Sequence, residues 1–364
     1  MEISESRRDF LRLRDRLLNH VYSGDSHYRD AVTPLLEMVL VPSGKFAARA
    51  DILPITVREG DRPLVSALLI TAHGMGDTLQ VSFFEAVRER QDAVDLLMQR
   101  ARELADAAGQ RRIVIGLNGH VNNGLGFLAG PYDKPACFGG GYNPPYYIDY
   151  LSRFSTSQGN LVSYAYDLSV TTMDREKKVL ERISRRFKVR EADFSDLRRE
   201  IALYTRLNNE CFVNHPLYFN RTEEEDYELF KSFGPFLKEE NLLVSELNGR
   251  PIGFLLWYPD FNELVGPGGK LGLLAALKYR LPGHQISRFR VAEVGVLPEF
   301  QGSAAIGGLV QRCVEIAKQN GHRFCESGWI FDDNFRSWGI SSRWADCVYK
   351  TYRYFEINMH EAGK

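Results

Sequence analysis

AEVGVLPEFQGSAAIGGL, residues 292–309, predicts a strand, a loop of small residues and the beginning of a helix. The strand is expected over Phe289 to Leu297 and should end there, because Pro298 has no N–H to offer a neighbouring strand. Six of the eight residues from Gln301 to Gly308 are Gly, Ala or Ser, so backbone amides there can approach an anion closely. A helix over Leu309 to Gln319 would aim its unpaired N-terminal N–H groups at that loop. The pattern indicates a pyrophosphate site, although an ordinary tight turn would also favour small residues.

The segments on both sides continue an alternation of strands and helices. Downstream we expect a strand in Arg323 to Phe331, a helix opened by Asp332-Asp-Asn, and an alternating strand from Val348 to Ile357. Upstream, Asn248-Gly249 is a strong hairpin signal between two apolar runs. The other upstream elements expected are a strand at Val189, helices over Asp196–Phe212 and Glu223–Leu237, and strands over Leu242–Leu247 and Pro251–Trp257.

This order of elements resembles the GNAT acyltransferase superfamily. In that family the loop after the fourth strand reads Gln/Arg-x-x-Gly-x-Gly/Ala and holds the CoA pyrophosphate. Gln301 fits the first position, but Ala304 and Ile306 stand where glycines are usual; one inserted residue would bring Ala305 and Gly307 there instead. The resemblance implies acetyl-CoA or a longer acyl-CoA as co-substrate. It would be held by Val296, Leu297, Gln301, Gly302, Ser303, Ala304, Ala305, Ile306, Gly307 and Asn334.

The first half of the chain repeats the same order of elements. The expected elements are strands over Phe46–Arg58, Pro63–His73 and Leu79–Ala86, a helix over Asp92–Ala108 and a strand over Arg111–Leu117. At the place of the loop stands Glu85-Ala-Val-Arg-Glu-Arg, which has no glycine and carries two carboxylates that would repel a pyrophosphate. A Gly/Asn-rich piece follows Leu117, and in Tyr142-Asn-Pro-Pro-Tyr-Tyr the two prolines should start a helix. With these segments the chain resembles bacterial tandem-GNAT proteins of unassigned function.

The resemblance implies the fold class and the domains. We expect an α/β (α+β) protein of two GNAT-like domains, each a mixed, mostly antiparallel central sheet flanked by helices. Residues 1–175 would form a degenerate domain without a pyrophosphate loop, 171–187 a charged helical connector, and 186–358 the acyltransferase domain with an insertion at 259–287.

In a GNAT an amine attacks the thioester carbonyl directly, so the reaction needs a base, an oxyanion donor and an acid for the thiolate. Glu293 is the candidate base, through a water, because a carboxylate in an apolar strand must face a wet cleft or a buried partner. An ion pair with Arg288 or Arg290 would explain it equally well. The resemblance assigns backbone N–H groups near Val296 and Leu297 to the thioester carbonyl and the pantetheine arm.

The general acid that would protonate the departing thiolate is less well defined. The family commonly uses a tyrosine about seven residues after the helix-starting Asn, and that spacing from Asn334 arrives at Ser341. Tyr349 and Tyr352 are the catalytic candidates that remain, although aromatic residues alternating on a terminal strand usually pack in a core. Asn334 could bond the pantetheine amide or cap its helix.

The insertion is long enough to carry a function of its own. From Pro259 to Arg290 there are five Lys or Arg against two acids, so it could close over an anionic acceptor, the CoA 3′-phosphate or, with its leucines, a long acyl chain. A plain packing helix between the halves is the alternative. Asp260 and Asn262 at its root are candidate substrate ligands.

Composition sets the remaining expectations. The 364 residues are 44% hydrophobic, and 46 basic against 47 acidic residues give no general attraction to nucleic acid or to a membrane. Five scattered cysteines, no 18-residue apolar run and no leader pattern favour a reducing, cytoplasmic location without a metal site. The GNAT resemblance implies an acyl-CoA-dependent N-acyltransferase, with N-acetyltransferase as the first expectation, acting on a small-molecule amine or amino-acid-like acceptor. The alternatives are a non-catalytic acyl-CoA sensor and a tandem-GNAT aminoacyl transferase using charged tRNA, which would need a basic groove.

Overall fold

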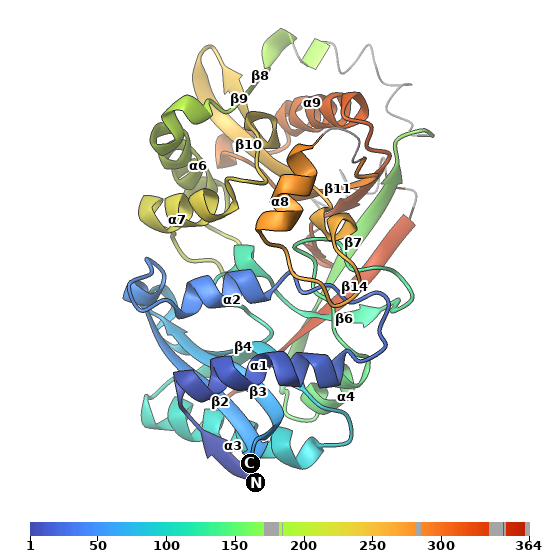
Figure 1. Cartoon of the computed structure of the whole chain (residues 1–364). Coiled ribbons are helices and arrows are strands. Elements are labelled where there is room, and N and C mark those ends of the chain that lie inside the picture. The colour runs from blue at the N-terminus through green and yellow to red at the C-terminus, as the bar shows by residue number, and fades with distance from the viewer. Residues whose placement is uncertain (171–181, 184, 282–284, 335–344, 346, 361–364) are drawn as a thin grey trace. The chain divides into compact units, whose positions relative to one another are not determined.

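The computed structural model describes residues 1–364 apart from 171–181, 184, 282–284, 335–344, 346 and 361–364 (Figure 1). Most of the predicted connector and the helix predicted after Asn334 lie outside the described residues. The chain divides into two compact units. Unit 1 comprises Met1–Leu161, Gly266–Lys270 and Lys350–Lys364, and unit 2 comprises Val162–Val265 and Leu271–Tyr349.

Unit 1 is built on a mixed sheet whose strands follow the order β1-β2-β3-β4-β5-β14. Neighbouring strands are antiparallel except β4 and β5, which run parallel. Strands β7 and β14 each begin in one unit and end in the other. The elements are β1 (Glu2–Ser4), α1 (Arg7–Val21), α2 (Thr33–Leu40), β2 (Ala50–Glu59), β3 (Arg62–Ala72), β4 (Thr78–Ala86), α3 (Gln91–Ala107), β5 (Arg112–Ile115), β6 (Phe127–Gly130), α4 (Tyr146–Ser152), β7 (Ser157–Asp167) and β14 (Cys347–Asn358).

Unit 2 has a sheet in the order β8-β9-β10-β11-β12-β7. Here β11 and β12 are the parallel pair and the other neighbours are antiparallel. Its elements are β8 (Lys188–Glu191), α6 (Leu197–Cys211), α7 (Glu223–Phe233), β9 (Leu242–Leu247), β10 (Arg250–Pro259), the 3₁₀ turn η7 (Phe261–Leu264), α8 (Leu273–Arg280), β11 (Arg288–Val296), the 3₁₀ turn η8 (Pro298–Phe300), α9 (Ala305–Gln319), β12 (Phe324–Ser327) and β13 (Ile330–Phe331).

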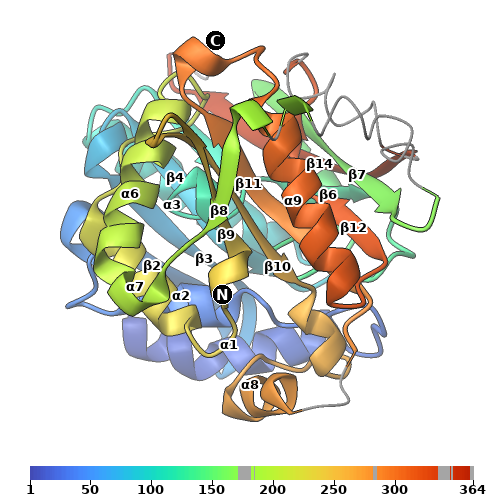
Figure 2. The same cartoon turned by 90° about the horizontal axis from the view of Figure 1, so that it is seen from above.

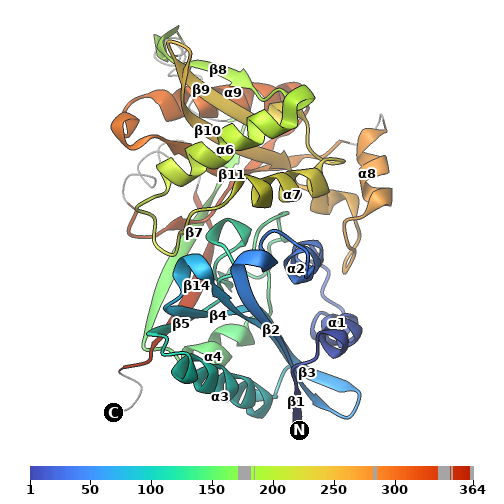
Figure 3. The same ribbon diagram turned by 90° about the vertical axis from the view of Figure 1, so that its left-hand side faces the viewer.

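The two units repeat one scaffold. In each, a strand and two helices precede three antiparallel strands, a helix and a parallel strand. Figure 3 shows α1 and α3 on opposite faces of the sheet of unit 1, and Figure 2 shows α6 and α9 on opposite faces of the sheet of unit 2. The predicted fold class, two domains each with a mixed, mostly antiparallel sheet flanked by helices, is confirmed.

The later part of the last strand of each half belongs to the other unit. Phe355 and Ile357 of β14 lie in the core of unit 1, fully buried, beside β5. The residues of β7 from Val162 onward belong to unit 2 and pair with β12. The domain boundaries predicted from the sequence place β7 in the domain at 1–175 and β14 in the domain at 186–358. A strand pattern in the sequence tells which residues face each side of a sheet but not which neighbouring strand they pair with.

Local chemistry explains the best-predicted turn. Asn248 and Gly249 have φ values of 51° and 80°, so both central residues of the β9–β10 hairpin are in the left-handed region that a type I′ turn requires. Likewise α4 begins directly after Pro144 and Pro145, as predicted.

No helix among the described residues is long and apolar enough to cross a bilayer. All five cysteines are described, and none forms a disulfide.

Unit 1 contains a buried carboxylate. Glu85 in β4 is 8% exposed, and it accepts hydrogen bonds from the hydroxyls of Tyr22 (2.9 Å) and Tyr147 (2.8 Å). Arg14 lies 3.8 Å from it. Burial raises the pKa of Glu85 to about 7, although Arg14 and the two hydroxyls act in the opposite direction. Glu85 therefore faces the core, and of the two carboxylates invoked against a pyrophosphate in this half only Glu89 is exposed.

We predict that Glu85 makes the stability of unit 1 depend on pH. A carboxyl group whose pKa is raised on folding stabilises the fold below about pH 4.5, and that contribution is lost as the pH rises through about 7. The loss is about 3 kcal/mol, the free-energy equivalent of the shift. In Glu85→Gln this pH dependence should be absent from urea unfolding of the full chain, whereas Glu89→Gln should behave like wild type. Parallel profiles for wild type and Glu85→Gln would contradict the assignment.

Candidate functional site

The segment that decides the fold forms a strand, a loop and a helix, as predicted. β11 ends at Val296, η8 follows, and α9 begins at Ala305 rather than at Leu309. Gly302 has a φ of +78°, which a residue with a side chain rarely adopts, and a Cβ there would meet no neighbour within 4 Å. The loop between η8 and α9 is therefore an exposed backbone turn at the beginning of a helix.

Backbone donors are available at the start of α9. Ala304, at the N-cap, offers no side-chain hydrogen bond, and within the described chain the N–H groups of Ile306 and Gly307 have no partner. Only the N–H of Ala305 finds a side-chain acceptor, the Ser303 hydroxyl at 3.3 Å. Unpaired N–H groups and the positive end of the helix dipole favour an anion. The side chain of Ala305 is fully buried, so only its backbone can contact a ligand, whereas Ala304 is exposed.

Near its end, one edge of β11 has no neighbouring strand among the described residues. β12 pairs with β11 only over Arg288–Val291, opposite Phe324–Ser327. On the other edge the Leu297 N–H donates to the Ile252 oxygen of β10 at 2.9 Å. Because successive N–H groups of a strand point to opposite edges, the Val296 N–H points away from β10. The Val296 N–H therefore remains a candidate donor, but the predicted role of the Leu297 N–H is wrong because β10 already uses it.

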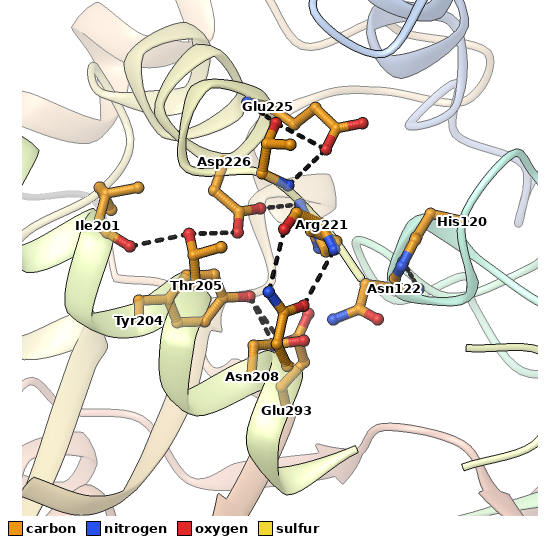
Figure 4. A network of polar contacts seen from close by, with 12 residues as sticks. His120, Asn122, Ile201, Tyr204, Thr205, Asn208, Arg221, Glu225, Asp226 and Glu293 are labelled. Carbon is orange, nitrogen blue, oxygen red and sulfur yellow. Dashed lines mark hydrogen bonds and ion pairs between the residues drawn. The ribbon is translucent and has the colours of Figure 1, made fainter. Parts of the chain in front are cut away.

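Glu293 lies on β11 within this stretch. Its Oε2 accepts hydrogen bonds from the Tyr204 hydroxyl and from the Asn208 side-chain amide, both at 2.7 Å (Figure 4). The carboxylate is half-buried. The ion pair considered from the sequence is not formed, because Arg288 pairs with Asp260 and Glu263 while Arg290 pairs with Glu326. Two neutral groups, a hydroxyl and an amide, therefore donate hydrogen bonds to this carboxylate.

Figure 4 shows a second layer of polar contacts behind Glu293. The Tyr218 hydroxyl lies within hydrogen-bonding distance of two side-chain amide oxygens, Asn208 Oδ1 at 3.0 Å and Asn209 Oδ1 at 2.6 Å. Behind it Arg221 forms a buried ion pair with Asp226, which also accepts a hydrogen bond from Thr205. Burial raises the pKa of Asp226 to about 6, although Arg221 acts in the opposite direction.

The approach of α6 to β11 depends on a glycine. Glu293 and Gly295 point to the same face of the strand. A Cβ on Gly295 would lie 2.8 Å from the Cβ of Cys211, one turn along α6 from Asn208. The missing side chain therefore lets the helix lie close enough for Asn208 and Tyr204 to reach Glu293.

Sequence reasoning missed Tyr204, Asn208 and Tyr218. A signal for two of them was present, because Tyr204 and Asn208 are four residues apart in a predicted helix and share its apolar stripe with Ile201. A fully buried amide on such a stripe needs a polar partner on the facing strand. Burial, with the nearby Glu293 charge, raises the pKa of Tyr204 well above its ordinary value, so its hydroxyl stays a donor.

The other site residues predicted from the sequence lie in different parts of the structure. Tyr349 is half-buried in unit 2, while Tyr352 is 2% exposed in unit 1. Asp260 and Asn262 are buried, and Asp260 both caps η7 and pairs with Arg288, so neither is presented to an acceptor. Asn334 is half-buried in a turn, where its N–H bonds the Phe331 oxygen. Gln301 and Gly302 are exposed in the loop.

Unit 1 has an equivalent of the strand end in unit 2. Ala86, the last residue of β4, lies opposite Val65 of β3, and the next N–H bonds back to β3 at 2.8 Å. Val296 opposite Gly253 has the same relation to β10. Ala86 is therefore the counterpart of Val296.

Tyrosines of α4 occupy the backbone groups at this position in unit 1. The Ala86 N–H donates to the Tyr147 hydroxyl at 2.8 Å, and the Tyr146 hydroxyl donates to the Ala86 oxygen at 2.8 Å. At the start of α3 the Arg90 N–H donates to the Tyr150 hydroxyl at 3.0 Å. The donors that are open in unit 2 are thus already paired in unit 1.

Comparison with known proteins places the fold. No family model matches the chain. A bacterial ceramide synthase from Caulobacter vibrioides is 24% identical over 277 residues, which cover 72% of this chain and 71% of that protein. Among solved structures, a glucosamine N-acetyltransferase region of a fungal multi-domain β-N-acetylglucosaminidase matches with a TM-score of 0.61 and 14% identity, over 98% of this chain and 38% of that one. A tandem GNAT protein from the clavulanic acid biosynthesis pathway matches with a TM-score of 0.55 and 12% identity, over 98% and 99% of the two chains. The chain therefore has the fold of GNAT acetyltransferases, in the tandem arrangement.

Proposed function

We propose that this protein is an acyl-CoA-dependent N-acyltransferase whose reaction takes place in unit 2. The observation that carries the proposal is Glu293, held by Tyr204 and Asn208 on the strand that leads into the open N-terminus of α9. One continuous segment thus offers a proton acceptor and an anion site. The GNAT fold and the resemblance to a ceramide synthase support acyltransferase activity.

The residues present suit an acyl-CoA. The N–H groups of Gly302, Ala304, Ile306 and Gly307 would bind the pyrophosphate oxygens at the positive end of α9. The Val296 N–H would receive the thioester carbonyl at the open edge of β11. In unit 1 the corresponding groups are paired with tyrosines, which supports the prediction that residues 1–175 bind no CoA.

The chemistry needs no covalent enzyme intermediate. The acceptor nitrogen attacks the thioester carbonyl carbon, and its proton passes to Glu293 through a water. The negative charge on the carbonyl oxygen is stabilised by the Val296 N–H. When the C–N bond is complete the C–S bond breaks, and the CoA thiolate leaves and takes up a proton. Tyr349 stays the candidate donor for that last proton, since Tyr352 is buried.

For the acceptor we propose a long-chain amino alcohol. The support is the similarity to a bacterial ceramide synthase, because a ceramide is the N-acyl product of such an amine. This acceptor is a primary amine, so it requires the same base and the same acyl donor as a small amine. A short or amino-acid-like amine is the alternative acceptor.

We predict that Ala304→Asp abolishes acyl-CoA binding without unfolding the protein. The carboxylate would stand about 4 Å from the pyrophosphate, a repulsion of about 4 kcal/mol at intermediate dielectric, or more than about 100-fold in Kd. A negative charge at the N-terminus of a helix interacts favourably with the helix dipole, so the Tm of the unliganded protein should stay equal or rise slightly. Ala304→Asn, of equal size without the charge, should bind nearly as wild type in calorimetry. An Asp variant with an unchanged Kd would place the cofactor elsewhere.

Glu293→Gln should lower turnover by about 10²- to 10⁴-fold while acyl-CoA affinity stays nearly unchanged. The loss should be largest at pH values where the acceptor amine is protonated. Glu246→Gln, another carboxylate of the same sheet, serves as control because it pairs with Arg190. If Glu293→Gln melts several degrees lower but keeps its turnover per folded molecule, Glu293 is a structural residue and not the base.

An acceptor panel tests the substrate class. Full-length protein is incubated with acetyl-CoA or palmitoyl-CoA and with sphinganine, ethanolamine or glucosamine, and amide products are measured by mass spectrometry. We expect the amide of sphinganine, with release of CoA, to dominate. Preferential acylation of the short amines would refute the long-chain acceptor but keep the acyltransferase, and no amide from any pair, despite measurable acyl-CoA binding, would favour a sensor.

A further inference from the structure

Large apolar side chains gather on one short helix of unit 2. In α8 and directly after it, Leu273, Leu274, Leu277 and Leu281 are 85, 84, 59 and 52% exposed. On this helix only small alanine side chains are buried against the unit. Figure 3 shows α8 as a separate short helix next to α7. Scattered single leucines are ordinary on a protein surface, but a contiguous group of four marks a surface that contacts something apolar.

The same helix carries positive charge, and within the described part of the chain neither Lys278 nor Arg280 forms an ion pair with an acid. The segment from Val265 to Leu281 contains no Asp or Glu. The Lys278 ammonium donates to the Leu264 oxygen at 3.3 Å, and the Arg280 guanidinium donates to the backbone oxygens after α7, at 3.0 Å to Pro235. Carbonyl partners fix these cations in position without cancelling their charge. Leucines and uncompensated cations are therefore combined on one short helix.

We propose that α8 docks onto the surface of a lipid bilayer that contains anionic phospholipids. The four leucines would enter the boundary between headgroups and acyl chains, with Lys278 and Arg280 at the level of the phosphates. A second copy of the chain fits less well, because a two-fold contact would bring these cations against themselves. A single acyl chain needs a groove, whereas side chains that are 84 and 85% exposed stand on a convex surface.

This inference revises the expectation that no membrane is a partner. That expectation was based on the charge of the whole chain and on the absence of a spanning segment, and neither quantity reports a local patch. Docking of this kind does not depend on the proposed function, because it needs neither acyl-CoA nor an amine. If the acceptor is a long-chain amine, docking would place unit 2 beside the bilayer in which such amines dissolve.

Vesicle sedimentation of the full-length protein tests the proposal. Vesicles of phosphatidylcholine alone and with added phosphatidylglycerol are the probes. The double variant Leu273→Ser/Leu274→Ser should lose about tenfold or more in apparent affinity, since two leucines no longer leave water. Lys278→Gln should lose about fivefold, only on the anionic vesicles, and added salt should reduce that difference. Val213→Ser, which removes another 60% exposed apolar side chain, is the matched control and should bind as wild type.

Folding of each variant is checked by its melting temperature, which should not change because the replaced side chains are exposed. Absence of vesicle binding by the wild type would overturn the proposal, as would equal binding by the double variant. A wild-type dimer that the double variant converts to a monomer, without vesicle binding, would assign α8 to a second copy of the chain and would overturn it as well.

Discussion

The parallel pairing of β11 and β12 ends at Val291 and Ser327, and the site depends on that early end. Beyond this point β11 keeps β10 on one edge, and no described strand pairs with its other edge, toward which the Val296 N–H points. Glu293 lies within the same stretch, and its carboxylate is half-buried. Had the parallel ladder continued, the sheet would have used the donor that the proposed chemistry requires.

Unit 1 shows what the same scaffold becomes when this opening is filled. The Phe83 N–H bonds the Asn118 side chain at 2.8 Å, and the tyrosines of α4 occupy the groups at the end of β4 and at the start of α3. Its carboxylate, Glu85, is enclosed by tyrosine hydroxyls, with an arginine beside it. The backbone N–H groups of Phe83, Ala86 and Arg90 are thus paired within unit 1 and are not available to a ligand. The two units therefore share a fold, and they differ in whether the strand end is open.

Much of this could be predicted from the sequence because the signals were local. The strand, loop and helix at 289–319 and the Asn248-Gly249 hairpin depend on residues next to one another in the chain, and both were correct. The pairing of β7 with β12 and of β14 with β5 could not be predicted, since each joins segments far apart in the chain. The commitment of the Leu297 N–H to Ile252 and of Asp260 to Arg288 also depends on pairings between segments far apart in sequence.

The residues around Glu293 illustrate the same limit. A carboxylate in an apolar strand was visible in the sequence, but its partners were not, because Tyr204 and Asn208 come from a helix more than eighty positions away. The ion pair considered instead used the nearest arginines in sequence, and the sheet directs both of them to other acids. Gly295, which lets α6 come close, has a role only once that helix is in place.

Hydrogen–deuterium exchange of the full-length protein, with and without acetyl-CoA, tests the central claim most directly. The account predicts that the ligand slows exchange of the backbone amides at 296–307 and leaves the amides at 86–94, the equivalent stretch of unit 1, unchanged. Unchanged exchange at 296–307 under conditions where acetyl-CoA binds, or slower exchange at 86–94 instead, would contradict it.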